Sequence, residues 1–403
     1  MARGYIQTME RGKHRIRLSL GEGPDGKRKE YSKVVYGTKA DAQRLLDEKK
    51  MELRQTGRII EPSKEMLENF LTTWKETVME HKVTEKTAES YWQMLTLYII
   101  PDLGSYPLGA ITPDMVQKKY NQMIRNGLSP RTIKYTHSVF NSAMAHAVKW
   151  KKIQNNPLSL LDLPKDAKEE QKAMTSEQVK LFMQAAEGNR RKILFETMIV
   201  TGLRPGEIYG LKWTDIDLEK GTLSVRRALS RLRGGEWRLG EPKTKRSRRS
   251  MPIPLGLIKS LQQQKQQNAA DKMESRVRIE KIRQEVNAGK RDPVEAEKSI
   301  QRIQYNDQNF VFPNKKGGPM DHSTVRGDDF KKILKKSGLD HIGFRMYDLR
   351  HTCATMLLKA GINPKVISER LGHASVTLTL DTYSHCLPDM QEEASEALNK
   401  MIY

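Results

Sequence analysis

The sequence predicts an α+β protein of several domains: a small N-terminal three-stranded sheet plus one helix, an all-helical middle region, and a mainly helical C-terminal region with a small β-sheet. The chain of 403 residues is longer than one hydrophobic core usually supports. Polar and apolar side chains alternate near the N-terminus, as they do in strands. Over most of the remainder, apolar side chains recur three or four residues apart, as they do in helices.

The composition is strongly basic, with a formal net charge of +22 at pH 7. Such a surface attracts polyanions, so nucleic acid is the first candidate partner; a ribosome-associated or membrane-surface protein is the alternative. The two cysteines, Cys353 and Cys386, are too few for a disulfide scaffold or a cysteine-based zinc site. With no long apolar run and a polar, basic start, the sequence predicts a soluble, cytoplasmic protein without a membrane partner.

Residues 4–36 alternate in polarity around the turn sequence GPDG at 23–26, which predicts a small antiparallel sheet. The run TKAD at 38–41 then begins a helix. Its apolar side chains should cover one face of the sheet, and these are Ala42, Leu45, Leu46 and Met51. On the exposed face we expect basic side chains that bind DNA phosphates or enter the major groove, namely Arg11, Arg15, Arg17 and Lys33. An ordinary solvated strand face is the alternative.

Residues 67–161 have a helical period, with Phe70, Trp74 and Val78 on one face. Prolines and glycines interrupt the pattern at 101–109, and the runs TPD at 112–114 and SPRT at 129–132 are typical of helix starts. About four helices therefore form a compact all-helical domain. Its exposed basic side chains could line a DNA duplex, although single lysines are more often only solvated; the candidates are Lys86, Arg131 and Lys134.

A further domain begins at the capping-box run TSEQ at 175–178. The apolar helix at 193–200 leads into the run TGLRPGEI at 201–208, where Gly202 should end one helix and Pro205 begin the next. Arg204 is thereby held in the joint.

Residues 222–253 predict three strands. The first contains Leu223 and Val225, the second spans 237–245, and the third spans 249–253; a turn lies at 234–235. The tip of the hairpin between the last two strands is basic, with the run KTKRSRR at 243–249.

Residues 258–306 are charged and rich in glutamine, with partial helical periodicity. We expect a long helical excursion, broken near 289–293, that is a solvated extension or a surface for protein contacts. The run FVFP at 310–313 should return to the core, and a helix should begin at 321–324. The chain should close with a short amphipathic segment at 389–401.

Three short runs then place an arginine, a histidine and a tyrosine on helical segments separated by turns. They are MYDLRHT at 346–352, LGH at 371–373 and DTYSH at 381–385. Taken singly, each residue has an ordinary structural explanation. Together with Arg204 and the hairpin lysines, they could converge on one phosphate group.

The combination fits phosphodiester cleavage without a metal ion. Arginine binds phosphate oxygens bidentately, a tyrosine phenoxide can attack phosphorus and conserve the bond energy as a phosphotyrosine, and a lysine among arginines can protonate the leaving oxygen. The sequence has no His-Glu-x-x-His motif, no paired carboxylates near the basic runs and no Walker-type glycine loop. We therefore expect neither a metal nor ATP, and no cofactor.

In order and spacing, five runs resemble the signature boxes of the tyrosine recombinase (phage integrase) family: TGLRPGE at 201–207, KTK at 243–245, YDLRH at 347–351, LGH at 371–373 and DTY at 381–383. The resemblance is specific from 175 to 387. Further toward the N-terminus the layout is similar to integrases of phages and conjugative transposons. It implies an arm-type DNA-binding domain (1–58), a helical core-type DNA-binding domain (63–161), and a catalytic domain (171–403) with a helical insertion at about 264–306 and a C-terminal tail at 388–403.

Carried over residue by residue, the resemblance implies that Arg204 and Arg350 clamp the scissile phosphate and that His373 supports it. Tyr383 would be the nucleophile, giving a 3′-phosphotyrosine and a free 5′-hydroxyl. Glu207 would orient Arg204 from behind.

The general acid is Lys243 or Lys245, and we favour Lys243. Tyr347 stands where the family usually has a histidine. It could slow proton transfer or donate a hydrogen bond, and it is also a competing nucleophile. His351 is more readily explained as structural.

The implied function is a site-specific DNA recombinase that integrates and excises a mobile element, a transposon or phage, through a Holliday junction. Its partners would be double-stranded DNA at core and arm sites, three further copies of the chain in a tetramer, and an excisionase or host DNA-bending protein. Two alternatives remain at this stage: a type IB-like topoisomerase, and a catalytically inactive DNA-binding regulator on the same fold.

Overall fold

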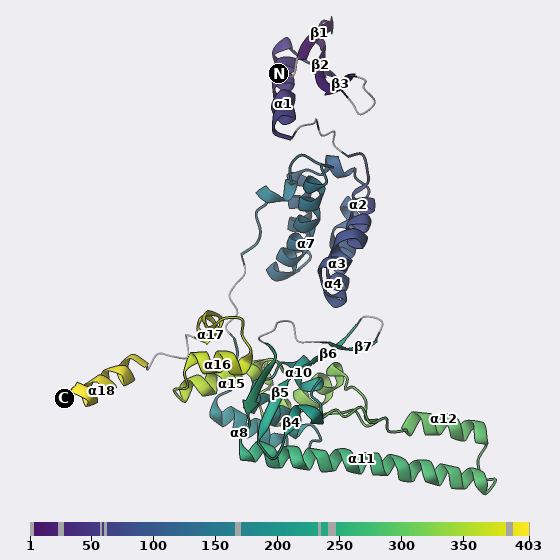
Figure 1. The fold of residues 1–403 in the computed structure, drawn as a ribbon, viewed down its shortest axis with the longest axis vertical. Coiled ribbons are helices and arrows are strands. Elements are labelled where there is room, and N and C mark those ends of the chain that lie inside the picture. Colours follow the sequence, from purple (N-terminus) through teal and green to yellow (C-terminus); the bar gives the residue numbers. More distant parts are fainter. Residues whose placement is uncertain are drawn as a thin grey trace. The chain divides into compact units, whose positions relative to one another are not determined.

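The computed structural model describes residues 4–22, 28–56, 59, 63–165, 171–232, 235–240, 247–383 and 390–402. The chain divides into two compact units, Met1–Ala167 and Lys168–Tyr403 (Figure 1). Helices dominate, and the strands form small antiparallel sheets, which confirms the predicted α+β class.

The first unit begins with the predicted antiparallel sheet and helix. Its strands are β1 (Gly4–Glu10), β2 (Lys13–Glu22) and β3 (Arg28–Tyr36), in the order β1-β2-β3. Helix α1 (Lys39–Thr56) packs Ala42 and Leu46 against the sheet. Met51 is 61% exposed, so its predicted place in this core is wrong. At 3.6 residues per turn, a residue five positions after Leu46 lies on another side of the helix.

The predicted basic face of this sheet is confirmed only in part. Arg15 and Arg17 lie on the face away from α1, because their neighbours in the strand, Ile16 and Leu18, are buried beneath the helix. Lys33 pairs directly with Ile16, so it belongs to the face that α1 covers. Arg11 lies in the turn between β1 and β2. Placing Lys33 and Arg11 on the same face as Arg15 and Arg17 was therefore wrong, because strand parity, not charge, decides the face.

The rest of the first unit is helical and has one hydrophobic core, which includes Phe70, Trp74 and Leu95. Pro113 and Pro130 occupy first turns as predicted, and the side chain of Ser129 accepts a hydrogen bond of 3.2 Å from the amide of Thr132. The elements are α2 (Leu67–Trp74), η1 (Lys75–Met79), α3 (Glu80–Lys82), α4 (Glu85–Tyr98), α5 (Ile100–Leu103), η2 (Leu108–Ala110), α6 (Pro113–Arg125), α7 (Pro130–Lys149) and η3 (Pro157–Leu160).

The second unit surrounds a large core with helices and two small sheets. One sheet has the order β4-β5-β8, and the other is the hairpin β6-β7. The strands are β4 (Ile216–Asp217), β5 (Thr222–Val225), β6 (Ala228–Arg231), β7 (Trp237–Gly240) and β8 (Arg249–Pro252). The helices are α8 (Ser176–Ala185), α9 (Lys192–Thr201), α10 (Pro205–Tyr209), η4 (Trp213–Asp215), α11 (Leu255–Asn287), α12 (Pro293–Ile303), α13 (His322–Thr324), η6 (Val325–Phe330), α14 (Lys331–Lys336), η7 (Asp340–Ile342), α15 (Asp348–Lys359), α16 (Pro364–Leu371), α17 (Val376–Tyr383) and α18 (Met390–Ile402).

Two strands of this unit were not predicted from the sequence. β4 is too short to leave a pattern, and β6 lies between the predicted first strand and the predicted turn, where no strand was expected. The predicted hairpin between the second and third strands is wrong, because β7 pairs with β6 and β8 pairs with β5. The predicted turn residue Gly234 lies outside the described residues. The predicted capping box at Thr175 is present, with Gln178 as its partner.

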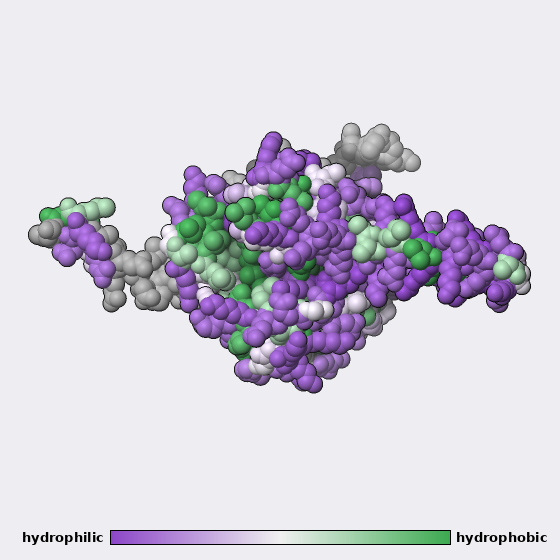
Figure 2. Space-filling view, turned by 90° about the horizontal axis from the view of Figure 1, so that it is seen from below, coloured by the Kyte–Doolittle hydropathy of each residue, from purple (hydrophilic) through white to green (hydrophobic). Residues whose placement is uncertain are grey.

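The predicted helical excursion is a long hairpin of α11 and α12. The first half of α11 packs on the core: Asn268 donates a hydrogen bond of 3.0 Å to the carbonyl of Val311, and Asp271 pairs with Arg190. Beyond Ser275, whose hydroxyl donates to the carbonyl of Ile303 at 2.7 Å, α11 and α12 project from the unit (Figure 1). Side chains along this projection are mainly hydrophilic, as seen on the right of Figure 2.

The predicted C-terminal amphipathic segment is helix α18, in which Leu398 and Met401 are 57% and 83% exposed.

Among the helices of the described ranges, none combines the length and the apolar character needed to cross a bilayer.

Candidate active site

Arg204 lies in a tight joint between two helices, as predicted. Helix α9 ends at Gly202, whose φ of 67° is left-handed and therefore favours glycine. Helix α10 begins with Pro205, which fits a first turn because it has no N–H to leave unpaired. Arg204 is the N-cap residue between them.

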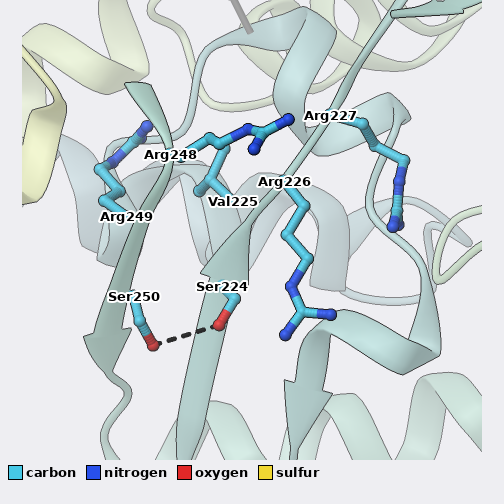
Figure 3. A pocket seen from close by; sticks show the side chains of 7 residues that line it. All are labelled: Ser224, Val225, Arg226, Arg227, Arg248, Arg249 and Ser250. Carbon is cyan, nitrogen blue, oxygen red and sulfur yellow. Dashed lines mark hydrogen bonds between the residues drawn. The ribbon is translucent and has the colours of Figure 1, made fainter. Parts of the chain in front are cut away.

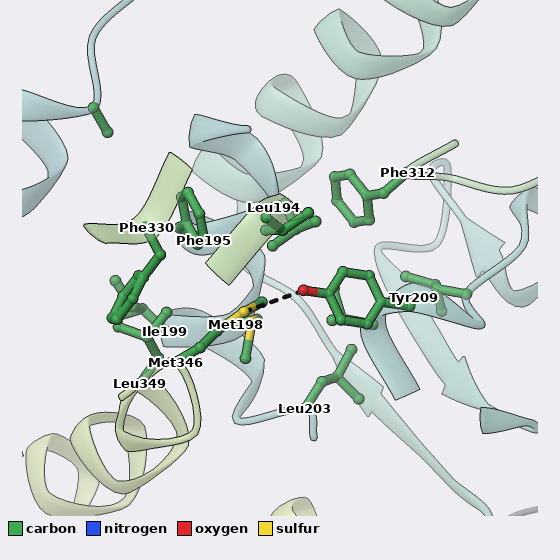
Figure 4. Close-up of a cluster of buried hydrophobic side chains, with 14 of the residues drawn as sticks. Leu194, Phe195, Met198, Ile199, Leu203, Tyr209, Phe312, Phe330, Met346 and Leu349 are labelled. Atoms are coloured by element: carbon green, nitrogen blue, oxygen red, sulfur yellow. Dashed lines mark hydrogen bonds between the residues drawn. The ribbon is translucent and has the colours of Figure 1, made fainter. Parts of the chain in front are cut away.

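Buried leucines fix the positions of both candidate arginines. Leu203 precedes Arg204 and Leu349 precedes Arg350, and both leucines are fully buried in the main core. Figure 4 shows them among the side chains of this cluster, where Tyr209 donates a hydrogen bond of 3.2 Å to the sulfur of Met346. Because the core is closely packed, each arginine begins from a rigid backbone position.

Glu207 joins Arg204 to a second arginine, Arg249. Arg204 donates to Oε1 of Glu207 from Nη1 at 2.8 Å and to Oε2 from its backbone amide at 3.0 Å. Arg249 donates to Oε1 from Nη1 at 3.2 Å and to Oε2 from Nη2 at 2.9 Å. We call these three side chains the Glu207 bridge.

Charge keeps the carboxyl group of the Glu207 bridge ionised. Burial alone raises the pKa of Glu207, whose side chain is only 3% exposed. The hydrogen bonds and charge of Arg249, together with the charge of Arg204, outweigh burial and hold the pKa of Glu207 below its ordinary value. The carboxylate is therefore available to orient Arg204 at neutral pH.

Arg350, on α15, is anchored to the same joint. Its Nη1 donates a hydrogen bond of 2.7 Å to the carbonyl of Gly202. Among the described residues, its Nη2 has no hydrogen-bond partner although it is buried. Arg350 as a whole is 1% exposed in the unbound protein. Burial and the charge of Arg204 lower the pKa of Arg350 to about 10, still well above neutral pH.

His373 follows the left-handed Gly372 that ends α16, which has a φ of 67°. Arg204 donates from Nη2 to the carbonyl of Gly372 at 3.0 Å, so the histidine turn is tied to the first arginine. On its other side, Nδ1 of His373 shares a hydrogen bond of 2.7 Å with the hydroxyl of Thr379 on α17. Burial, then the charges of Arg350 and Arg204, lowers the pKa of His373 to about 4.

Tyr347 lies at the start of α15 with 41% of its surface exposed. Its ring packs edge-on against His351, with centroids 5.2 Å apart. His351 is 8% exposed, and burial is the main cause that lowers its pKa to about 4. These contacts fit a structural role for His351.

Three predicted site groups lie outside the described part of the chain: Lys243, Lys245 and the side chain of Tyr383. The backbone of α17 reaches Tyr383 and carries Thr379, the partner of His373. The structure thus brings together Arg204, Glu207, Arg350 and His373.

Arg249 is the site residue that sequence reasoning missed. In the sequence it is one basic residue in the run RSRRS, and Glu207 lies 42 positions away. A buried position facing a carboxylate across two elements leaves no local signal. The one indication is that Arg249 lies two positions before the apolar Met251 in a short strand, so both side chains point to the same face of the sheet.

A pocket of about 470 Å³ opens beside the Glu207 bridge, and residues of the paired strands β5 and β8 and of the segments next to them line it (Figure 3). Ser224 and Ser250 share a hydrogen bond of 3.1 Å at its wall. Four arginines line it, which makes it attractive to anions; they are Arg226, Arg227, Arg248 and Arg249.

Two family descriptions match parts of this chain. Residues 172–389 match the phage integrase family, and residues 66–124 match the N-terminal SAM-like domain of phage integrases. A tyrosine recombinase XerC-like protein of Caldanaerobacter subterraneus subsp. tengcongensis is 30% identical over 409 residues, covering 98% of each chain.

Two solved structures have a similar fold. The Tn1549 transposon integrase, in complex with a circular intermediate DNA, has a TM-score of 0.63 at 22% identity and covers 83% of this chain and 99% of its own. A lambda integrase tetramer bound to a Holliday junction has a TM-score of 0.55 at 19% identity and covers 94% of each chain.

The fold and the arginine-rich site define an enzyme of the tyrosine recombinase class, which transfers DNA strands by means of a catalytic tyrosine. Within that class, the chain belongs to the phage integrase family and is a site-specific recombinase.

Proposed function

We propose that Tyr383 attacks a DNA phosphate held by Arg204 and Arg350, with His373 donating a further hydrogen bond. The phenol of Tyr383 gives up its proton to water, and its oxygen forms a bond to phosphorus while the bond from phosphorus to the 5′-oxygen breaks. The leaving oxygen takes a proton from Lys243 or Lys245. The same steps in reverse, with another strand's 5′-hydroxyl as attacking group, rejoin the DNA without ATP.

One observation carries this assignment: the two arginines and the histidine turn are tied to one another through backbone carbonyls. Arg350 holds the carbonyl of Gly202, and Arg204 holds that of Gly372, next to His373. Cationic donors fixed in this way need little rearrangement when charge develops on phosphate oxygens. Tyr347 supports the reaction from the rim, where it can donate a hydrogen bond in place of a histidine.

The substrate we propose is the end of a mobile element, a transposon or phage, in double-stranded DNA. The family match, and the Tn1549 integrase seen with a circular intermediate, support this choice. The lambda integrase tetramer on a Holliday junction supports assembly of four copies. An excisionase or a host DNA-bending protein would set the direction, and the reaction would take place in the cytoplasm.

The first unit contains the proposed DNA-binding surfaces outside the active site. Residues 63–161 would bind the core site through the neighbouring starts of α4 and α7, which Tyr135 and Ser90 join by a hydrogen bond of 3.1 Å. Lys86, Arg131 and Lys134 lie on these two helices. Residues 1–58 would bind a separate arm site, with Arg15 and Arg17 on the open sheet face as its main contacts. Arg11 and Lys33 would contribute only from the turn and the strand edge.

The catalytic part we propose is residues 171–403, with the hairpin at about 264–306 as an insertion and 388–403 as a tail. The match to recombinases over nearly the whole chain favours strand exchange over a topoisomerase or an inactive regulator.

Covalent trapping tests the proposal directly. The full-length protein is incubated with a nicked suicide substrate that carries the end of its own element, and the DNA-linked peptide is mapped by mass spectrometry. An adduct on Tyr383 is expected. An adduct on Tyr347 would reassign the nucleophile, and tight binding without any adduct would refute the enzymatic proposal.

A further inference from the structure

Arg249 differs from the other arginines around the pocket because it is buried and fully engaged. Its side chain is 7% exposed, whereas that of Arg226 is 60% exposed. Its two terminal nitrogens contact Glu207, and Nη1 also donates to the carbonyl of Ser247 at 3.0 Å. Its Nε donates to the carbonyl of Arg370 at 2.6 Å. Four of the five N–H donors of Arg249 are thus committed to protein acceptors, which leaves this buried side chain little capacity to bind DNA.

These contacts close a ring that passes through the candidate active site. From Arg204 on α10 the ring runs to Glu207, then to Arg249 on β8, then to the carbonyl of Arg370 in the last turn of α16. Gly372 follows in the same turn, and its carbonyl accepts from Arg204. The ring therefore fixes Arg204 and the turn that carries His373 with respect to each other.

Arg370 strengthens the same junction from the opposite side. Its Nη1 donates to the carbonyl of Pro252 on β8 at 3.4 Å, and its Nη2 donates to the carbonyl of Val200 on α9 at 3.2 Å. The strand β8 and the end of α16 are thus linked in both directions. β8 begins at Arg249, the last residue of the basic run KTKRSRR at 243–249.

We propose that Arg249 is a positioning residue: it acts on the strand-transfer reaction through Glu207 and the carbonyl of Arg370, and it does not touch DNA. This proposal rests on the proposed function of Arg204 and His373. Only arginine meets the geometry, because two parallel donors face the carboxylate while a third, on Nε, points to a carbonyl. Lysine at this position keeps the positive charge but can reach only some of the oxygen atoms that accept hydrogen bonds from Arg249.

Two variants separate positioning from binding. In Arg249→Gln, the covalent adduct of Tyr383 with a suicide substrate should form about 10–100-fold more slowly, the range found for residues that orient the ligands of metal sites from behind. The Kd for an uncleaved core site should stay within about twofold. The matched control is Arg278→Gln, which removes an exposed Arg–Glu pair with Glu274 on α11 and should change neither quantity.

The pH dependence gives a readout that simple loss of packing would not produce. With one cationic partner instead of two, Glu207 should take up a proton at a higher pH, so the acid limb of the adduct-formation rate should move to higher pH in Arg249→Gln. Arg249→Lys should lie between this variant and the wild type. An unshifted acid limb with a lowered rate would contradict positioning through Glu207.

A double-mutant cycle covers the case in which Arg249→Gln folds poorly. Glu207→Gln together with Arg249→Gln leaves a neutral amide pair without a buried unpaired charge. If Arg249 acts through Glu207, adding Arg249→Gln to Glu207→Gln should cost much less than it costs in the wild type. Additive losses, or a weakened Kd equal to the loss in rate, would overturn the proposal. Failure of the wild type to form any adduct would instead refute the proposed function itself.

Discussion

Arg350 donates a hydrogen bond of 2.7 Å from Nη1 to the backbone carbonyl of Gly202. This contact links the second candidate arginine to the residue that ends α9, close in the chain to Arg204. The position of one phosphate-binding group therefore depends on the backbone conformation that delivers the other. Gly202 therefore serves both the fold, because it ends α9, and the candidate site, because its carbonyl holds Arg350.

Gly202→Ala should destabilise the protein strongly. The residue has a φ of 67°, and an added Cβ would collide with Leu371 and approach the sulfur of Cys353 at 3.3 Å. Gly338 provides the control, because it also has a left-handed φ, 73°, but no atom lies within 4 Å of an added Cβ. Gly338→Ala should cost about 1–2 kcal/mol from backbone strain alone, and Gly202→Ala about 1–3 kcal/mol more. Urea unfolding measures both; equal losses would contradict overpacking at Gly202.

Tyr383→Phe should abolish adduct formation while leaving the Kd for an uncleaved core site almost unchanged, because only the nucleophilic oxygen is removed. Tyr347→Phe is the comparison, and it should still form the adduct, more slowly if its hydroxyl donates to the phosphate. The readout is the covalent complex on a denaturing gel. Adduct in Tyr383→Phe at the wild-type level would remove Tyr383 from the mechanism.

Arg204→Lys should reduce the rate of adduct formation by about two to three orders of magnitude, which is typical for removing one preorganised donor. The lysine keeps a positive charge but cannot contact both Glu207 and the carbonyl of Gly372, as Arg204 does. Single-turnover kinetics with saturating enzyme isolates the chemical step. A wild-type rate in Arg204→Lys would show that the guanidinium group of Arg204 is not needed for adduct formation.

Stability should fall in mild acid because of His373. Its pKa is lowered from 6.5 to about 4 by burial first and by nearby arginine charge second. Between these values the unfolded chain binds a proton that the folded protein rejects, so the free energy of unfolding decreases as pH falls from 6.5 toward 4. His373→Gln should show a shallower decrease when unfolding is followed at several pH values. His351 titrates over the same range and should account for part of the slope that is left.

The projecting part of the α11–α12 hairpin should be dispensable for cleavage. Replacing residues 277–301 with a short glycine–serine turn keeps Asn268, Asp271 and Ser275, which make the contacts with the core and with the base of α12. The melting temperature and the adduct rate should therefore stay near the wild-type values. A large loss of melting temperature would show that the projection stabilises the core; loss of recombination with cleavage intact would show that it acts in assembly.

Much of this architecture is visible in local sequence. Gly202 and Pro205 mark a helix end and a helix start because left-handed φ and a missing N–H are properties of single residues. Such signals predict Arg204 in its joint, the break between α11 and α12, and the capping box at Thr175. The residues that make up each of these signals lie within a few positions of one another, so they can be recognised in the sequence alone.

The remaining features depend on partners far apart in the chain. Arg249 belongs to the site because β8 brings it to Glu207, and Lys33 left its predicted face because of the register of β3 against Ile16. The pairing of β8 was predicted wrongly because its partner is β5, where Ser224 lies 26 positions from Ser250. Register and burial of charge emerge only when elements pack, so a single sequence does not reveal them.

The Glu207 bridge holds two guanidinium groups on one carboxylate, and Arg350 is buried close enough to Arg204 for the charge of Arg204 to lower its pKa. The unbound protein therefore keeps mutually repelling cations at short range in its interior. If a phosphodiester binds at these arginines as proposed, it would relieve that repulsion, and affinity for DNA and resistance to unfolding would be thermodynamically linked through the same side chains.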